Sequence, residues 1–318
     1  MHAYILRRLL ALLPTLLFAS VIVFVIVRMV PGDVIDMMMS QNDISADALG
    51  RDQLIKTLGF DKPMWEQYFL WAGRIVFHGD LGQSLWHGTP VLEMILARVP
   101  ATFSLGVMAM VIALSIALPI GVYSAIRQDT AGDYLARSFS ILMLAVPSFW
   151  LGTMVMVFPS IWWGWSPEVN YVAFLDDPLQ HIKQMLVPAI ILGMALSAIT
   201  MRLTRTMMLE VLRQDYIRTA WAKGLNESLV VMRHALRNAM IPVVTLIGLQ
   251  APLLIGGAVV IEQIFVLPGM GQLLLDAVQQ RDYPVITGIF LITGVAVMII
   301  NLLVDLSYGL FDPKVRHH

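Results

Sequence analysis

The stretch VPATFSLGVMAMVIALSIALPIGVYSAI, which is Val99–Ile126, contains no Asp, Glu, Lys or Arg. A bilayer core about 30 Å thick requires roughly 20 helical residues, so this stretch is long enough to cross a membrane. Backbone N–H and C=O groups in lipid must be satisfied within the segment, which favours a helix over irregular chain. The stretch therefore predicts a helical membrane protein.

Five more uncharged runs of similar character occur along the chain. They are Leu9–Val27, Ser138–Pro167, Gln184–Met201, Asn238–Ile261 and Tyr283–Val304. We therefore expect an all-α polytopic membrane protein with six transmembrane helices, over residues 9–30, 99–126, 138–160, 184–203, 239–262 and 284–306. The composition agrees, because hydrophobic residues make up 58% and charged residues only 14% of the chain, against about half and about a quarter in soluble domains.

The charges of the connections predict an orientation. Thirteen of the 21 Lys and Arg lie in or directly beside residues 1–8, the connection 127–137, the connection 204–238 and the tail 307–318, which places these segments and both termini in the cytoplasm. Residues 31–98 and 263–283 are then extracytoplasmic. Within the first of these, Met64–Phe77 is rich in Trp, Tyr and Phe and predicts an amphipathic helix lying on the membrane surface. The net charge of −1 argues against nucleic acid as a partner.

Few polar residues interrupt the predicted spans. Intramembrane polar groups are costly and therefore candidates for a role in transport. The candidates for lining a pathway are Ser197, Thr200, Thr245 and Gln250. For Gln250, a hydrogen bond between helices and a position in the pore are equally open. Glu262, at the outer end of the fifth span, is expected to cap a helix end or to be solvated at the interface.

The cytoplasmic connection 204–238 is the most informative segment. Glu210–Lys223 has apolar residues at helical spacing, and Gly224 follows as at a left-handed helix C-terminus. One interpretation is a basic, solvated loop that only enforces topology. The other is a helix that docks in a groove of a soluble partner.

The same connection resembles the EAA loop of ABC-importer permeases. The stretches that carry the resemblance are DYIRTAWAKGL, Asp215–Leu225, and HALRNAMIP, His234–Pro242. More narrowly, the chain is similar to the first, B-type permease of the peptide/nickel class. Further matching segments are Val30–Asp33, His78–Gly82, Phe265–Gly271, Arg281–Pro284 and Asp312–Arg316. The chain departs from the general pattern in lacking its Glu, one Ala, Ile and Pro, and Trp221 replaces a basic residue that is common in the subclass.

The resemblance implies a fold similar to type I importer permeases and a set of residues that couple the membrane helices to an ATPase. Carried over, these are Asp215, Tyr216, Arg218, Thr219, Ala220, Lys223 and Gly224. Small residues at positions 219, 220 and 224 would let the short helix approach another backbone closely. Trp221 would point along the partner's cleft or back toward the membrane.

The implied assembly contains several other chains. The resemblance predicts a second homologous permease subunit, two ATP-binding subunits that bind ATP and Mg, and an extracytoplasmic substrate-binding protein, all in the bacterial inner membrane or against it. The implied cargo is a di- or oligopeptide, although nickel, glutathione and some sugar importers share the scaffold.

The chain itself has no ATPase motif. A P-loop requires G-x-x-x-x-G-K-[ST], and no lysine of this sequence follows a glycine. We therefore expect no catalytic residue, no metal site and no cofactor within this chain. Two alternatives remain open at this stage: an ion-coupled secondary transporter, which usually shows midplane charges or broken helices in repeated halves, and a membrane assembly factor that transports nothing.

Overall fold

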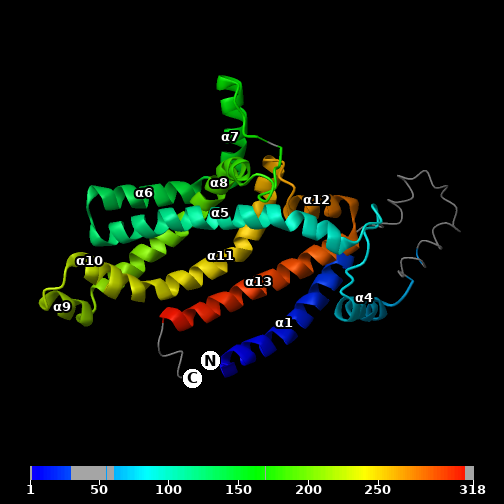
Figure 1. The fold of residues 1–318 in the computed structure, drawn as a ribbon, viewed down its shortest axis with the longest axis horizontal. Coiled ribbons are helices and arrows are strands. Elements are labelled where there is room, and N and C mark those ends of the chain that lie inside the picture. The colour runs from blue at the N-terminus through cyan, green and yellow to red at the C-terminus, as the bar shows by residue number, and fades with distance from the viewer. Residues whose placement is uncertain (1, 30–54, 56–60, 169, 312–318) are drawn as a thin grey trace. The chain divides into compact units, whose positions relative to one another are not determined.

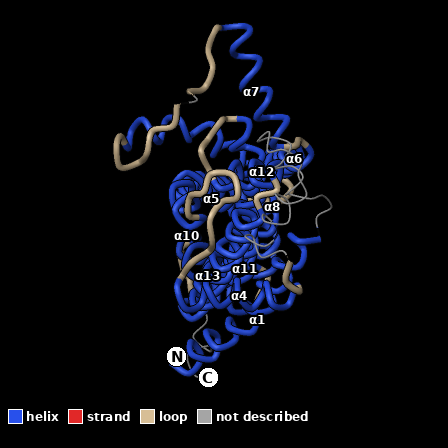
Figure 2. The backbone as a smooth tube through the Cα atoms, turned by 90° about the vertical axis from the view of Figure 1, so that its right-hand side faces the viewer, coloured by secondary structure: helices blue, strands red, loops and turns tan. Residues whose placement is uncertain are grey.

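The computed structural model of the protein describes residues 2–29, 55, 61–168 and 170–311. Within these ranges the backbone is helix and loop, apart from one isolated antiparallel bridge between Gln83 and Pro90 (Figure 2). The predicted motifs Val30–Asp33 and Asp312–Arg316 lie outside the described residues. The expectation of an all-α protein is confirmed for the described part of the chain.

The helices follow one another along the chain as labelled in Figure 1. Their bounds are α1 His2–Met29, α4 Met64–His78, α5 Val91–Ile126, α6 Ala131–Ala145, α7 Ser148–Trp163, α8 Pro178–Leu212, α9 Asp215–Ala222, α10 Glu227–Leu229, a π-helical turn Val230–Ala235, α11 Leu236–Ile264, α12 Met270–Gln280 and α13 Tyr283–Phe311. The predicted helix over residues 64–77 is present as α4. The predicted helix over residues 210–223 is divided, because residues 210–212 end α8 and α9 begins at Asp215.

The number of helices that can cross a membrane agrees approximately with the predicted six. Four stretches among the described residues are long and apolar enough: Val91–Ile126, Pro178–Leu212, Glu227–Gln250 and Tyr283–Val304. The pair α6 and α7 is a fifth candidate, and α1 contributes a shorter apolar helix over Leu13–Met29.

The third predicted span is not one straight helix. Helices α6 and α7 meet at an angle of 86° across Val146 and Pro147. Pro147 has no N–H to donate, and Val146 before it takes the extended conformation, with φ −90° and ψ 119°. The ring of a proline disfavours helical backbone at the preceding residue, so the continuous helix over residues 138–160 breaks at this point.

The chain divides into two compact units. The first contains residues 1–9, 100–271 and 297–318, and the second contains residues 10–99 and 272–296. Each unit therefore combines segments that lie far apart in the sequence. The predicted coupling segment 204–238 lies wholly in the first unit, and α4 lies wholly in the second.

In the first unit, α5 and α8 approach closely because small residues line their contact. Ala109, Ala113 and Ala117 recur every four positions on α5, and all three are fully buried. A Cβ atom added to Gly193 of α8 would lie 2.7 Å from the carbonyl oxygen of Ala109. Small residues at such contacts are typical of packed membrane helices, because they let the backbones approach.

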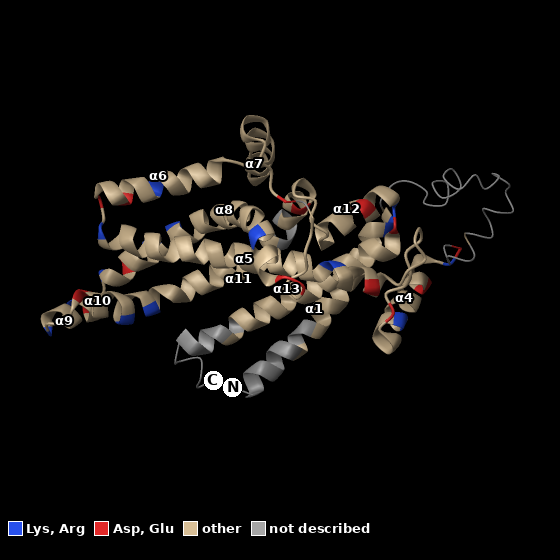
Figure 3. Cartoon of the chain, turned by 45° about the horizontal axis from the view of Figure 1, so that its top comes forward, with Lys and Arg blue, Asp and Glu red and all other residues tan. Residues whose placement is uncertain are grey.

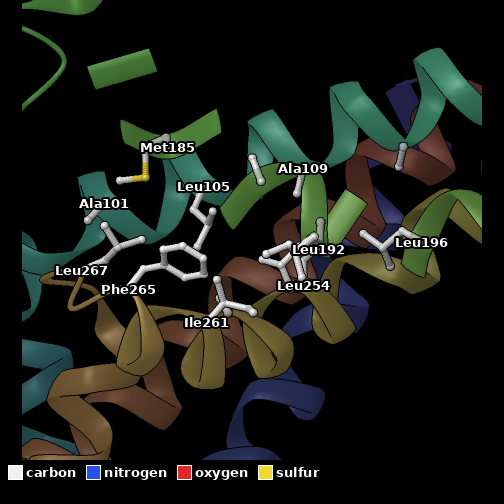
Figure 4. Close-up of a cluster of buried hydrophobic side chains, with 14 residues drawn as sticks. Ala101, Leu105, Ala109, Met185, Leu192, Leu196, Leu254, Ile261, Phe265 and Leu267 are labelled. Carbon is white, nitrogen blue, oxygen red and sulfur yellow. The ribbon is translucent and has the colours of Figure 1, made fainter. Parts of the chain in front are cut away.

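A cluster of larger apolar side chains joins α5, α8 and α11. Figure 4 shows Leu105 from α5, Leu192 from α8 and Ile261 from α11 directed toward the same interior, with Phe265 beside them. Leu105 and Ile261 are fully buried, and Phe265 is 2% exposed. This packing fixes the three helices as one body, and the segment that joins α8 to α11 extends from its end (Figure 1).

Candidate functional site

The first part of the site is the short helix α9, which forms for local reasons. Asp215 lies in its first turn, where a carboxylate interacts favourably with the helix dipole. Gly224 ends it with φ +74°, a left-handed conformation that glycine adopts without a steric penalty. The Gly224 N–H donates to the Trp221 carbonyl at 2.9 Å, and the Leu225 N–H donates to the Ala220 carbonyl at 3.4 Å. These two bonds form a Schellman motif, as the position of Gly224 in the sequence predicts.

One face of α9 is bound to the protein itself. Ile217 is fully buried and Ala220 is 7% exposed. Both belong to an apolar cluster with Met208 of α8 and with Val230 and Ala235 of the π-helical turn. The helix is therefore held against the base of α8 and α11, and a displacement of α9 must displace these helices or break the cluster.

The other face of α9 is open and polar. Asp215 and Arg218 lie 3.4 Å apart with side chains 97% and 74% exposed. Tyr216 accepts a hydrogen bond from Asn238 of α11 at 2.9 Å. Thr219 is exposed on the same helix, and Lys223 is exposed directly after its last residue. An exposed ion pair contributes little stability, so these charges are available to a partner.

One expectation for α9 needs correction. The small side chain of Ala220 is expected to let the helix approach the backbone of a partner, but it faces the apolar cluster of its own chain. Its small volume instead lets α9 lie close to the rest of this chain. Trp221 is 43% exposed and lies outside that cluster, so it does not anchor α9 internally.

The chain returns from α9 to α11 without a long irregular connection. Asn226 caps α10 by accepting the Ser228 N–H at 3.0 Å. The π-helical turn over Val230–Ala235 follows directly and continues into α11. Residues 228–238 thus form one unbroken helical run with Val230 and Val231 buried. Single π-helical turns inside helices occur often at functional sites.

A buried ion pair between Asp133 and Arg205 joins α6 to α8, near the start of the connection 204–238. The carboxylate of Asp133 has no exposed surface, and Arg205 donates to both of its oxygens at 2.8 Å. The hydroxyl of Ser124 and the Asp129 N–H also bind this carboxylate. Arg137 lies 3.3 Å away. No sequence pattern predicts this pair, because the partners are far apart in the chain and only the fold brings them together.

Charged residues of the first unit gather at its α9 end. Figure 3 shows Lys, Arg, Asp and Glu positions around α9, α10 and the start of α6, whereas the middle of α5, α8 and α11 carries few. This distribution is what a membrane boundary at the α9 end requires, because charges inside the hydrocarbon core are costly.

The candidate pathway residues are placed differently from one another. Ser197 and Thr200 are fully buried and Gln250 is 1% exposed. The Gln250 side-chain amide donates to the Thr200 hydroxyl at 3.1 Å, which links α11 to α8. For Gln250 this favours the hydrogen bond between helices over a position in the pore, because the amide is enclosed by its own chain. Thr245 is partly exposed, and its hydroxyl donates to the Ile241 carbonyl at 3.0 Å.

Glu262 is not solvated, contrary to one of the two expectations. Its side chain is fully buried, and it accepts a hydrogen bond from the Thr102 hydroxyl at 2.6 Å and from the Gly271 N–H at 2.8 Å. Gly271 lies in the first turn of α12, so the carboxylate caps that helix and the capping expectation holds. A Cβ atom at Gly269 would overlap the Glu262 carboxyl group, which explains the glycine at that position.

In the second unit, two of the motifs singled out in the sequence meet. The bridge between Gln83 and Pro90 closes a hairpin directly after His78–Gly82. Ser84, at its base, donates a hydrogen bond to the carboxylate of Asp282 at 2.5 Å, and Trp86 donates to the Gln280 carbonyl at 2.7 Å. Asp282 belongs to the segment Arg281–Pro284, so this segment holds the hairpin in place.

Together these features define the class of protein: a helical membrane protein with a short helix packed against the ends of two spanning helices. Comparison with known families assigns the class more closely. Residues 117–317 match the family described as binding-protein-dependent transport system inner membrane component, and residues 1–106 match the N-terminal part of such a membrane component. The chain belongs to this family and is an inner-membrane permease subunit of a transport system.

Individual relatives agree over the full length. The chain is 41% identical to the dipeptide transport system permease protein DppB of Escherichia coli strain K12, covering 100% of this chain and 99% of that one. It is 42% identical to the oligopeptide transport system permease protein AppB of Bacillus subtilis strain 168, with 100% of both chains covered. These relatives support the interpretation of this chain as a permease subunit, rather than as an ion-coupled secondary transporter or an assembly factor.

A solved structure shows a related fold. The chain is similar to a subunit of the MetNI methionine ABC transporter in an inward-facing conformation, with a TM-score of 0.57 and 15% identity over 70% of this chain and 98% of that one. At this identity the likeness concerns the fold alone, which agrees with the expected resemblance to importer permeases.

Proposed function

We propose that this chain forms half of the translocation pathway of an ATP-driven importer of di- or oligopeptides. A second, homologous permease subunit completes the pathway, and an extracytoplasmic binding protein delivers the substrate. Two ATP-binding subunits, which hold ATP and Mg, dock at residues 205–237, the segment that contains α9. Both termini then lie in the cytoplasm. The observation that carries the proposal is α9 itself, because one face is open and polar while the other is locked to α8 and α11.

Movement passes from the partner to the membrane helices through few contacts. A shift of the ATP-binding subunit pushes on Asp215, Arg218 and Lys223, which are exposed. The buried side chains of Ile217 and Ala220 pass that shift to α8 and to the π-helical turn. ATP binding and hydrolysis thus bias the pathway between inward- and outward-facing states, because the docked partner binds the two states with different affinity.

The peptide cargo is supported by two relatives of full length. They are named dipeptide and oligopeptide permeases, and the whole chain aligns with each. Uptake into proteoliposomes that contain the complete transporter and its binding protein tests the cargo directly. Labelled dipeptides and longer peptides are expected to accumulate with ATP, whereas uptake of nickel, glutathione or sugar alone overturns this part of the proposal.

Substitution of Gly224 tests the role of α9. No atom lies within 4 Å of a Cβ placed there, so a side chain disturbs only the left-handed backbone. A β-branched residue disfavours that conformation by about 1–2 kcal/mol, whereas Asn adopts it far more readily. We expect Gly224→Val to lose most uptake while the protein still inserts and folds. Gly224→Asn is the control and keeps most uptake.

The chain contains no cysteine, so single cysteines allow a direct test of docking. Cysteine at the exposed position Arg218 is expected to cross-link to an ATP-binding subunit, with a yield that changes when nucleotide is added. Cysteine at Leu175, which is 92% exposed in the connection between α7 and α8, is the control and does not cross-link. Normal uptake by Gly224→Val together with no cross-link at position 218 would refute the docking role.

A further inference from the structure

Helix α4 has an inner face that contacts the end of α1 within the second unit. The rings of Tyr68 and Trp71 lie with their centroids 5.4 Å from the Phe24 ring. Arg28 donates to the Gln67 side chain at 3.0 Å. Phe24 is fully buried by this packing. The aromatic residues of the predicted surface helix are thus divided, and only part of them faces outward.

The outward face of α4 is a stripe of large apolar side chains. Trp65, Phe69 and Val76 recur at helical spacing and are 65%, 67% and 75% exposed. Phe77 adjoins them and is 81% exposed. Contiguous apolar surface of this kind usually marks a place where protein or membrane covers it.

The contacts with α1 determine the depth of this stripe in the membrane. The Tyr68 hydroxyl lies 2.9 Å from the Ser20 hydroxyl, and Gln67 binds Arg28. From Ser20 to Met29 the helix rises about 14 Å, at roughly 1.5 Å per residue. The uncharged run of α1 ends at Val27, just before Arg28. Helix α4 therefore crosses α1 at the boundary between its uncharged and charged parts.

The face of α1 that contacts α4 is also apolar before the contact. Leu13 and Leu17 lie on the same face as Phe24 and are 63% and 61% exposed, so apolar surface of α1 adjoins α4. Charged side chains lie at the two ends of α4 rather than along the stripe: Lys62 and Glu66 near its start and Arg74 near its end. An interfacial helix has this arrangement, with apolar side chains in the acyl boundary and basic groups beside lipid phosphates.

We propose that the outward face of α4 binds lipid and embeds Trp65, Phe69 and Val76 in the headgroup–acyl boundary of the leaflet at the C-terminal end of α1. In the orientation proposed above this is the outer leaflet. The headgroup zone is about 5–8 Å deep on each side of the hydrocarbon core. The contacts of α4 with α1 extend from Ser20 to Arg28, about 12 Å along α1, so α4 reaches from the uncharged run into that zone.

Spin labelling of the complete transporter tests the proposal. Because the chain has no cysteine, Phe69→Cys and Val76→Cys each carry one nitroxide on this chain. The labelled complexes are placed in nanodiscs of phosphatidylethanolamine and phosphatidylglycerol. Collision rates are then measured with oxygen, which concentrates in lipid, and with the water-soluble complex NiEDDA. Leu17→Cys on α1 and Leu175→Cys, 61% and 92% exposed, are the lipid and water references.

We expect both α4 labels to collide several-fold more often with oxygen than with NiEDDA, as at position 17. Strong collision with NiEDDA, as at position 175, would show that the stripe faces water and would overturn the proposal. Protection from both reagents would also overturn it, because a protein partner such as the second permease would then cover the stripe. Phe69→Cys removes one ring contact with Tyr68, and ATP-driven uptake by the labelled transporter verifies its fold.

Discussion

Removal of the buried charge at Asp133 is expected to destabilise the protein strongly. Asp133→Asn preserves the shape of the side chain but leaves the Arg205 guanidinium without its two charged contacts at 2.8 Å. Breaking one side of a buried ion pair usually costs about 3–5 kcal/mol. Arg205 keeps the Ser124 hydroxyl at 3.0 Å and its side chain is 18% exposed, so we take the lower end of this range, about 3 kcal/mol.

The assay is thermal unfolding of the purified transporter, followed by tryptophan fluorescence. For a chain of this size about 1 kcal/mol shifts Tm by roughly 2 °C, so Asp133→Asn is expected to lower Tm by about 6 °C. Arg137→Gln is the matched control. Arg137 lies 3.3 Å from the same carboxylate, but its side chain is 38% exposed, and exposed pairs contribute about 1 kcal/mol or less.

The double variant Asp133→Asn with Arg205→Gln distinguishes an ion pair from loss of shape. If the unpaired charge of Arg205 causes the destabilisation of Asp133→Asn, the added Arg205→Gln substitution restores at least half of the lost stability. Equal Tm shifts for Asp133→Asn and Arg137→Gln would refute the reasoning. A double variant that is simply the sum of its two single variants would refute it as well.

Three further substitutions test the packing. Gly193→Ala forces α8 away from α5 and is expected to reduce expression and Tm, whereas Gly106→Ala, with no atom within 4 Å of its Cβ, is expected to change neither. Gln250→Leu removes the side-chain hydrogen bonds from α11 to Thr200 and Leu196 of α8, each worth about 0.6–1.7 kcal/mol, and should leave uptake unchanged; a changed peptide preference would instead place Gln250 in the pathway. Gly269→Ala displaces the Glu262 carboxyl group from its bonds to Thr102 and Gly271 and is expected to lower Tm; an unchanged Tm would contradict this.

Features that depend on neighbours in the chain were predictable from the sequence. Val99–Ile126 reads as a spanning helix because length and polarity alone decide whether a segment can cross a bilayer. The end of α9 at Gly224 was predictable because a left-handed cap is a property of one residue and its neighbours. The break at Pro147 has a local signal as well, although a proline in an apolar run predicts a kink rather than a bend of 86°.

Features that depend on which faces of the helices pack together were decided by the tertiary structure. Asp133 and Arg205 carry no shared local pattern, and only the packing of α6 on α8 joins them. Gln250 is equally compatible with a pore and with a contact between helices until the fold places the Thr200 hydroxyl beside it. Ala220 points inward for the same reason. Periodicity shows that a helix has two faces, whereas the packing of the remaining helices determines which face each side chain occupies.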